Sequence, residues 1–299
     1  DDSKPARWLC GFLLGTAIAS RPTAACFAIT IGGYLWLRRR DALPALLFGA
    51  CVTPLLMCIY NQYYFGSPIN FAQELVGHQI ALEKTGSERI WQTRLTGLLV
   101  SPSRGLLVFS PFMAFALWGA RRLWRDDKHA CLRTLLLAAV ATMLVQCKWF
   151  DWWGGWAYGY RPWLEAAPFL TLCLIPVIDR ICERTLSAAV FGAALAWSVL
   201  VQGVGAFAYD KYWNTRDLHS VVNGDEARFF TNEVMARAFA VNSGGQYTGM
   251  FKCNIDLPVC RYRLWSLDDN AIGYYMGERF HVARHNRVRA GMSELLNAP

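Results

Sequence analysis

One carboxylate and one guanidinium stand inside a stretch of aromatic residues near the middle of the chain. The stretch runs from Trp149 to Pro168 and begins Trp-Phe-Asp-Trp-Trp-Gly-Gly-Trp-Ala-Tyr-Gly-Tyr-Arg. Asp151 and Arg161 can pair with each other, or they can hold a sugar hydroxyl and a phosphate. Glycines between them leave room for a ligand or for another backbone segment. These residue types support two interpretations, a site for a lipid-linked polar substrate or an aromatic belt at a membrane surface with a structural ion pair.

Two further arginines are expected at the same depth as Arg161. Arg21 and Arg104 both fall at the outer ends of predicted membrane segments. Each alone is typical of a snorkelling anchor, but three guanidiniums at one membrane face suit a phosphate at headgroup depth. We predict that Arg161, with Arg21 or Arg104, contacts a phosphate while nearby aromatic residues form the sugar side of the site. The predicted substrate-binding residues are Arg21, Asn61, Tyr64, Arg104, Asp151, Trp152, Trp153, Tyr158 and Arg161.

Other chemistries find little support in the residues. His281 and His285 have the spacing of a metal-binding helix, but Val282 stands where zinc proteases carry a glutamate. We find no glycine loop that would cradle a phosphate and no serine in a nucleophile elbow. No ligand set for a divalent metal is visible in the sequence, so the prediction contains no metal site and leaves the cofactor open.

Composition indicates a membrane protein. The chain has 299 residues, is 54% hydrophobic and contains 13 tryptophans. Several apolar runs approach the ~20 residues that a helix needs to cross a bilayer. The net charge of +8 comes with 30 lysines and arginines, which we place mainly at membrane edges, where basic residues set orientation. A nucleic-acid-binding protein would carry a basic stripe on a soluble domain, so the sequence argues against that class.

The apolar runs predict a transmembrane helical domain over residues 1–208. Residues 8–37 read as a hairpin of two short helices that turns at Arg21-Pro22, with one long kinked helix as the alternative. In the loop 71–103 we expect an amphipathic helix at the interface, with Trp91 and Leu95 on its border. Further spans are predicted over residues 43–60, 106–118, 132–147, 166–177 and 186–208.

Charges then orient the bundle. Basic loops at residues 38–40, 121–125 and 180–184 predict a shared cytoplasmic end. This topology places residues 209–299 outside, as a small extracytoplasmic tail of mixed structure, with a helix over 225–240 and a strand over 261–267. In that tail Cys253 and Cys260 flank a proline-containing turn. A disulfide there fits an oxidising compartment, although spacing alone does not establish it.

Four motifs, taken in order, resemble the polytopic GT-C glycosyltransferases of bacteria, which are relatives of protein mannosyltransferases and aminoarabinose transferases. The resemblance covers most of the chain, and Gln202-Gly203 and Arg263-Leu264-Trp265 are also similar to that group. Each motif is weak alone, and the four together are moderately specific. They are Gly15–Pro22, Tyr60-Asn61 with Phe65–Pro68, Ser101–Pro111, and Trp152–Trp156 with Tyr158, Gly159 and Arg161.

This resemblance implies an all-α polytopic protein of the bacterial inner membrane with a GT-C-like helical bundle. Such a protein takes a sugar from a polyprenyl phosphate donor and passes it to an acceptor at the outer face of the membrane. The implied partners are a lipid-linked sugar donor and membrane lipid. The resemblance leaves the sugar, the acceptor and the oligomeric state open.

The catalytic carboxylate of that family lies in the first outer loop, after the first helix. Nothing in this sequence matches that loop, so we expect the chain to be the C-terminal part of a longer protein and assign no catalytic base. The alternative is a non-catalytic binding or transport protein, flippase-like, for a lipid-linked glycan. A transporter should show paired repeats with broken helices in both halves, and the sequence shows one broken segment only. A purely structural membrane subunit is the third interpretation.

Overall fold

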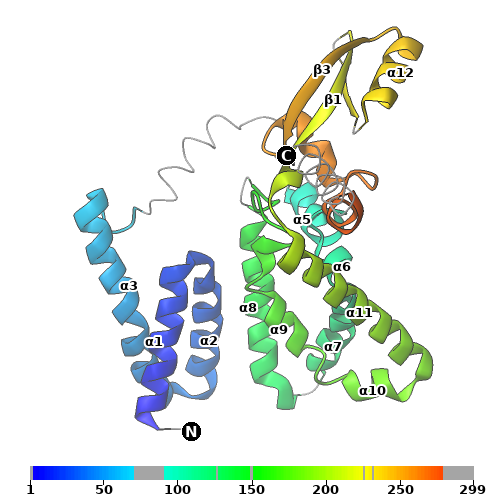
Figure 1. Ribbon diagram of the computed structural model, residues 1–299. Coiled ribbons are helices and arrows are strands. Elements are labelled where there is room, and N and C mark those ends of the chain that lie inside the picture. Colours follow the sequence, from blue (N-terminus) through cyan, green and yellow to red (C-terminus); the bar gives the residue numbers. More distant parts are fainter. Residues whose placement is uncertain are drawn as a thin grey trace, which may run out of the picture.

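The computed structural model describes residues 3–70, 91–125, 127–148, 151–224, 226–230 and 232–278. These residues are mostly helical, with one small three-stranded sheet. The sheet lies beyond one end of the helices and forms a cap on them (Figure 1). The all-α prediction therefore describes the helical part of the chain, while the tail is of mixed structure.

Three helices open the chain. They are α1 (Lys4–Ser20), α2 (Ala25–Arg38) and α3 (Leu43–Phe65), joined by the short 3-10 helices η1 (Pro22–Ala24) and η2 (Arg40–Ala42). Arg21 is extended (φ −146°, ψ 110°) and precedes Pro22, a combination that ends a helix because the residue before proline avoids helical angles. The predicted hairpin with its turn at Arg21-Pro22 is confirmed, and the long kinked helix is wrong.

Glycines bring α1 and α3 into direct backbone contact. A Cβ atom added at Gly11 would lie 2.0 Å from the carbonyl oxygen of Leu46, and one at Gly15 would lie 2.2 Å from that of Ala50. Because both partners advance by four positions, the two helices run parallel. Small residues four apart allow this approach, which suits helices that pack in lipid.

The second group of helices is more broken than predicted. It comprises α5 (Trp91–Val100), α6 (Leu106–Phe109), η3 (Pro111–Ala114), α7 (Phe115–Leu123), η4 (Asp127–His129), α8 (Ala130–Gln146), η5 (Arg161–Trp163), α9 (Ala167–Leu172), α10 (Ile178–Glu183) and α11 (Thr185–Ala208). The predicted single spans over 106–118 and 166–177 are wrong. Pro111 interrupts the first, since proline lacks the N–H that continues a helix, and α9 ends at Leu172, before Pro176.

The direction of the helices gathers the basic loops at one end. In Figure 1, α1, α3, α8 and α11 run toward the cap, and α2, α7 and α9 run back from it. The loops that carry residues 38–40, 121–125 and 180–184 consequently share the end opposite the cap. The aromatic stretch, which lies between α8 and α9, is at the cap end.

Two described helical stretches are long and apolar enough to cross a membrane, Arg40–Phe65 and Thr185–Ala208, and Ala130–Gln146 is a shorter apolar helix. Their apolar side chains point outward to an unusual degree. Phe48 on α3 is 70% exposed and Phe207 on α11 is 94% exposed. Only 17% of the most apolar part of the first stretch, and 11% of the second, is buried inside the protein.

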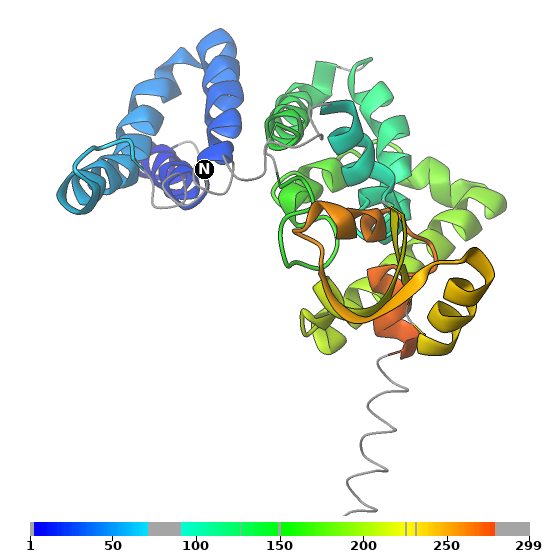
Figure 2. The same ribbon diagram turned by 90° about the horizontal axis from the view of Figure 1, so that it is seen from above.

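The tail begins where α11 ends, at Ala208, and contains the sheet. Strands β1 (Thr215–Asn223), β2 (Glu226–Phe230) and β3 (Gln246–Asn254) are antiparallel in the order β2-β1-β3. Helix α12 (Glu233–Ser243) packs on the sheet, and η7 (Pro258–Leu264), α13 (Ala271–Gly273) and the π-helical turn η8 (Tyr274–Glu278) follow. Viewed along the helices, the cap lies over part of the second group and not over the first three helices (Figure 2).

Two predictions for the tail are wrong. The helix expected over 225–240 begins only at Glu233, where the Asn232 side chain accepts a hydrogen bond from Val234 N–H, and the residues before it form β2. Phe230, within the range of that expected helix, pairs with His219 of β1. The strand expected over 261–267 is the 3-10 helix η7, which buries Arg263 and Leu264.

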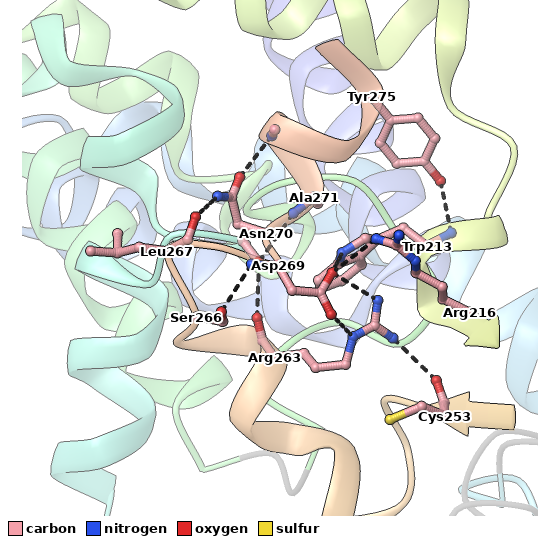
Figure 3. A network of polar contacts seen from close by, with 12 residues as sticks. Trp213, Arg216, Cys253, Arg263, Ser266, Leu267, Asp269, Asn270, Ala271 and Tyr275 are labelled. Atoms are coloured by element: carbon pink, nitrogen blue, oxygen red, sulfur yellow. Dashed lines mark hydrogen bonds and ion pairs between the residues drawn. The ribbon is translucent and has the colours of Figure 1, made fainter. Parts of the chain in front are cut away.

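A buried ion pair holds the lower part of the cap together (Figure 3). Asp269 accepts hydrogen bonds from Arg263 through both carboxylate oxygens, at 2.6 and 3.3 Å, and from Trp213 Nε1 at 3.1 Å. Arg216 approaches the same carboxylate at 3.5 Å. Arg263 also donates to the carbonyl of Cys253. Such a pair must be fully hydrogen-bonded to repay its desolvation, and this network provides those partners.

Candidate functional site

The two adjacent tryptophans of the aromatic stretch are core residues. Trp152 and Trp153 are both 0% exposed. The Trp152 ring lies against Gly97 of α5, where an added Cβ would come within 2.4 Å of it, and its centroid is 5.9 Å from that of Trp265. The prediction that these rings form the sugar wall of a site is wrong, because the cap and α5 cover them and large aromatic rings supply much of a core's buried area.

Arg104 is also buried and cannot reach a ligand at the surface. It is 0% exposed, and its three guanidinium nitrogens donate to Trp153 O at 3.1 Å, Ser103 O at 2.9 Å and Asn214 Oδ1 at 2.8 Å. Its guanidinium carbon lies 5.3 Å from the Trp213 ring centroid, a cation–π distance. Burial lowers the pKa of Arg104 to about 10. We correct its role from phosphate ligand to junction between helices and cap.

Arg21 has a partner within the protein. Its Nη1 lies 2.6 Å from Glu165 Oε1, and the Thr23 hydroxyl donates to the other oxygen of Glu165 at 2.7 Å. The predicted free guanidinium at this turn is therefore one half of an ion pair. Glu165 is the residue that sequence reasoning missed, although it belongs to the aromatic stretch.

Asn61 and Tyr64 lie near the end of α3. Asn61 is buried and donates to Pro68 O at 3.3 Å. Tyr64 is exposed, and its ring contacts Tyr60 and Tyr63 of the same helix. The hydrogen bond and ring contacts of these two predicted ligands stay within α3 and the turn that follows it. They are a helix-end feature, and the structure does not bring them to the aromatic stretch by any of these contacts.

Asp151 shapes its own turn. Its Oδ1 accepts the backbone N–H of Gly155 at 3.1 Å, and its charge raises the pKa of buried Arg104, against the larger effect of burial. Asp151 thus acts on the backbone of its own turn and on Arg104.

Tyr158 is enclosed by aromatic rings. Its ring meets Phe109, Tyr209 and Tyr275 at centroid distances of 5.1, 5.7 and 5.8 Å, and Gly205 of α11 leaves the space that it fills. Its hydroxyl is buried without a hydrogen-bond partner among the described residues. Burial raises the pKa of Tyr158. This residue is part of the packing between α11 and the cap.

Arg161 is the predicted arginine that remains at the surface. Its side chain is exposed at the start of η5. Its charge lowers the pKa of Tyr209, against the larger effect of burial. The Tyr209 hydroxyl donates to Trp156 O at 2.7 Å and accepts from Asn214 Nδ2 at 2.9 Å. A Cβ at Gly154 (φ +74°) would lie 2.9 Å from the Pro162 ring and 3.6 Å from the Cβ of Arg161; a positive φ of this kind favours glycine.

A carboxylate from the tail completes this group. Asp256 accepts the indole N–H of Trp156 through Oδ2 at 3.0 Å and that of Trp153 through Oδ1 at 3.3 Å. Trp156 is 42% exposed, whereas Trp153 is buried, so of the two indoles that Asp256 holds only Trp156 reaches the surface. We call Trp156, Arg161, Tyr209 and Asp256 the rim site. Hydrogen bonds join Trp156 to Tyr209 and to Asp256, and exposed Arg161 lies next to Gly154 in the same aromatic stretch. Only the Cys253–Cys260 turn pointed to Asp256 in the sequence.

That turn is closed as predicted. Cys253 and Cys260 form a disulfide with their Cα atoms 5.7 Å apart. Within the loop, Asn254 Oδ1 accepts the N–H of Asp256, and the Ile255 N–H donates to Asn214 O. The loop is thus tied to the same Asn214 that contacts Tyr209 and Arg104, which gives Asp256 a defined position.

No group of three or more potential metal ligands occurs among the described residues. His281 and His285 lie outside those residues. The rim site offers one cation, one carboxylate, one hydroxyl and one exposed ring, which are groups that bind a phosphate and polar hydroxyls directly.

In comparisons with known proteins, no protein-family model, no curated protein and no solved structure matches the chain. Functional inference therefore rests on the residues and their geometry.

Proposed function

We propose that this protein is a multi-pass protein of the bacterial inner membrane. The supporting observation is the outward-facing apolar surface of α3 and α11, of which 17% and 11% is buried in their most apolar parts. The core helix of a soluble protein is mostly covered, and soluble monomers rarely expose large apolar patches. α8, although shorter, carries the same kind of surface, with Leu137 and Leu144 half exposed.

The cap faces the outside in this proposal. Three basic loops share the end opposite the cap, which the positive-inside rule assigns to the cytoplasm. The disulfide of the cap suits an oxidising compartment. Cys182 is exposed at the basic end, and Lys252 is exposed on the cap. With the other free cysteines replaced, a membrane-impermeant thiol reagent added outside should label Lys252→Cys and spare Cys182 in intact cells. Labelling of Cys182 from outside would reject this orientation.

We propose further that the protein is a glycosyltransferase that uses a polyprenyl-phosphate sugar at this outer face. The motifs that resemble GT-C glycosyltransferases run through the turn at Arg21 and the aromatic stretch, both at the cap end. The observation that carries the proposal is that Arg161 is exposed in the aromatic stretch, next to Gly154, at the end where the apolar helices leave the proposed bilayer. A guanidinium in that position suits the phosphate of a lipid whose tail lies along the helices.

In this mechanism Arg161 stabilises the charge that grows on the departing lipid phosphate as the bond to the sugar breaks. Removing such a contact costs roughly 2–4 kcal/mol of transition-state stabilisation, or about 30- to 1,000-fold in rate. The test is transfer of a radiolabelled sugar from polyprenyl phosphate by the full-length protein in detergent. Arg161→Ala should lose activity, and Arg161→Lys should recover part of it, because lysine lacks the planar fork.

Arg121 provides the matched control, because it is exposed at the opposite, basic end. Arg121→Ala should transfer at the wild-type rate. Wild-type turnover and donor affinity in Arg161→Ala would reject the proposed role of the rim site. Folded protein is measured in each preparation by its gel-filtration profile, so that a loss of protein is not read as a loss of rate.

A second function is non-catalytic binding or transport of a lipid-linked glycan. It is favoured by the hydrogen bonds that the carboxylates near the site already accept. Asp151, Glu165 and Asp256 each accept hydrogen bonds from the protein itself, so none is assigned as the base that deprotonates an acceptor. The same assay separates the two functions. A transporter would bind the donor in an Arg161-dependent manner and would release no polyprenyl phosphate in the presence of any acceptor.

A further inference from the structure

Trp156 is an exposed tryptophan whose orientation is held at both ends. Its backbone carbonyl accepts the Tyr209 hydroxyl at 2.7 Å, and its indole N–H is donated to Asp256 at 3.0 Å. Its side chain nevertheless remains 42% exposed. A tryptophan that anchors a protein at the lipid surface keeps its N–H toward water and headgroups. Here the N–H is used inside the protein, and a ring surface is offered in a fixed orientation.

Asp256 has acceptor capacity left after holding the two indoles. An ionised carboxylate has about four lone-pair sites, and each oxygen of Asp256 accepts one indole N–H. The residue is half-buried, and its backbone is fixed by Asn254 and Arg261. A neighbouring polar ligand can therefore donate hydroxyl hydrogen bonds to Asp256 without displacing either tryptophan.

Trp156 follows two glycines, which carry no side chain of their own. Gly154 and Gly155 adopt φ values of +74° and +63°, which other residues rarely adopt. Arg161 follows close to Gly154. The rim site thus combines a fixed ring, a carboxylate with acceptor capacity left and an exposed guanidinium.

We propose that Trp156 and Asp256 form a sugar-binding platform, on which a pyranose ring stacks against the indole and donates hydroxyl hydrogen bonds to Asp256. This inference rests on the proposed function, because it takes the phosphate of the same lipid-linked sugar to be bound by Arg161. It adds the residues that select the sugar. Aromatic rings with a few polar groups are the usual means by which proteins orient small polar ligands.

The test compares two lipids that differ only in the sugar. Dissociation constants are measured for the full-length protein in nanodiscs with polyprenyl phosphate and with polyprenyl phosphate carrying glucose, mannose or galactose. Wild type should bind at least one sugar-bearing lipid more tightly than the bare lipid. Trp156→Ala should reduce that preference by about tenfold, the equivalent of one good contact, and should leave the affinity for bare polyprenyl phosphate unchanged.

Two further variants serve as controls. Trp156→Phe keeps a ring and loses the N–H that orients it, and it should retain part of the preference. Trp124→Ala removes a tryptophan that is somewhat more exposed (54%) and lies at the opposite end of the molecule, and this variant should retain the full preference. A wild type without any sugar preference, or a Trp156→Ala variant that keeps the wild-type preference, would overturn the platform.

The outcome for Arg161 is separate. Arg161→Ala should weaken the binding of bare and sugar-bearing lipid by the same factor, which leaves the sugar preference intact. If Arg161→Ala binds both lipids as wild type does, the phosphate role in the proposed function fails while the sugar preference of Trp156 is still measured. If the preference alone is absent, the platform fails and the phosphate role stands.

Discussion

The Arg21 guanidinium lies 2.6 Å from the Glu165 carboxylate and so joins the turn between α1 and α2 to the segment that leads into α9. The two residues stand 144 positions apart in the chain. The first three helices otherwise meet the second group mainly where α2 packs on α8. This ion pair, with Thr23, is thus a polar link at the cap end between the two groups of helices.

The Arg21–Glu165 pair should contribute little to stability. Because the Arg21 side chain is 40% exposed, solvent screens the pair, and we expect a coupling free energy of about 0.2–1 kcal/mol. A double-mutant cycle with Arg21→Ala and Glu165→Gln, followed by thermal unfolding in detergent, measures it. Donor affinity should not change in Arg21→Ala. A loss of donor affinity equal to that of Arg161→Ala would restore Arg21 to the phosphate site.

Gly15 should tolerate no side chain. A Cβ there would lie 2.2 Å from the Ala50 carbonyl oxygen, whereas nothing lies within 4 Å of a Cβ at Gly32. Gly15→Ala must push α1 from α3 and should cost about 1–3 kcal/mol. Gly32→Ala, in α2, should be neutral or stabilise by up to about 1 kcal/mol, because glycine is a poor helix former. Chemical unfolding of both variants measures these changes. Equal losses in the free energy of unfolding would contradict the close contact between α1 and α3.

Arg104 should matter for stability. Arg104→Ala leaves Asn214 Oδ1 and Trp153 O buried without their donor, and lost hydrogen bonds to a charged group cost about 1.5–3 kcal/mol each. We expect poor expression or a clearly lowered melting temperature. Arg161→Ala, at the surface, should change the free energy of unfolding by no more than about 0.5 kcal/mol. The reverse order of the two melting temperatures would show that the burial is wrong.

The Tyr158 hydroxyl should be dispensable. It is buried without a partner among the described residues, whereas the Tyr160 hydroxyl lies 2.9 Å from Ser110 Oγ. Tyr158→Phe removes an unsatisfied polar group and should be neutral or stabilising. Tyr160→Phe should cost about 1 kcal/mol. Thermal unfolding of the two variants tests this prediction. A Tyr158→Phe variant as unstable as Tyr160→Phe would show that the Tyr158 hydroxyl has a partner.

Stability should fall at alkaline pH. Burial raises the pKa of Tyr158, Tyr209 and Tyr275, and raises that of Tyr262 to about 12. Above pH 10, where tyrosines of the unfolded chain lose their protons, the folded chain keeps them. The stabilisation from these groups is complete below pH 10 and is lost as pH rises through the folded pKa values. Arg104, whose pKa burial lowers to about 10, acts in the opposite direction above that pH.

The measurement for this prediction is the free energy of unfolding between pH 9 and 12. Tyr262→Phe should make the decline shallower, since one proton that the folded state retains is removed. A stability that rises over this range in the wild type would show that the arginine outweighs the tyrosines.

Local pattern was sufficient for the helices that consist of one apolar run. α3, α8 and α11 were predicted because a helix satisfies its backbone within its own segment, and apolar length then decides where it forms. Proline alone was an uncertain guide. Pro54 lies inside α3, whereas Pro111 interrupts a predicted span, because neighbouring residues and packing decide whether a missing N–H is tolerated.

The roles of the three arginines were settled by tertiary structure alone. Arg21, Arg104 and Arg161 have the same chemistry and the same predicted depth in the sequence. The cap folds over Arg104, Glu165 meets Arg21, and Arg161 stays at the surface. Burial and pairing depend on which distant segment packs beside a residue, and the local periodicity of the sequence does not predict this.

The sequence shows which aromatic residues the stretch contains, but it does not show which of their rings are buried and which are exposed. Trp152, Trp153 and Trp156 are alike in type, yet the first two fill the core and the third is held at the surface by Asp256, 100 positions away. The sequence by itself determined where the uninterrupted apolar helices α3, α8 and α11 form, which end is basic and that Cys253 can pair with Cys260. Which groups face a ligand was decided by the fold of the cap, because exposure is a property of surfaces that only meet when distant segments pack.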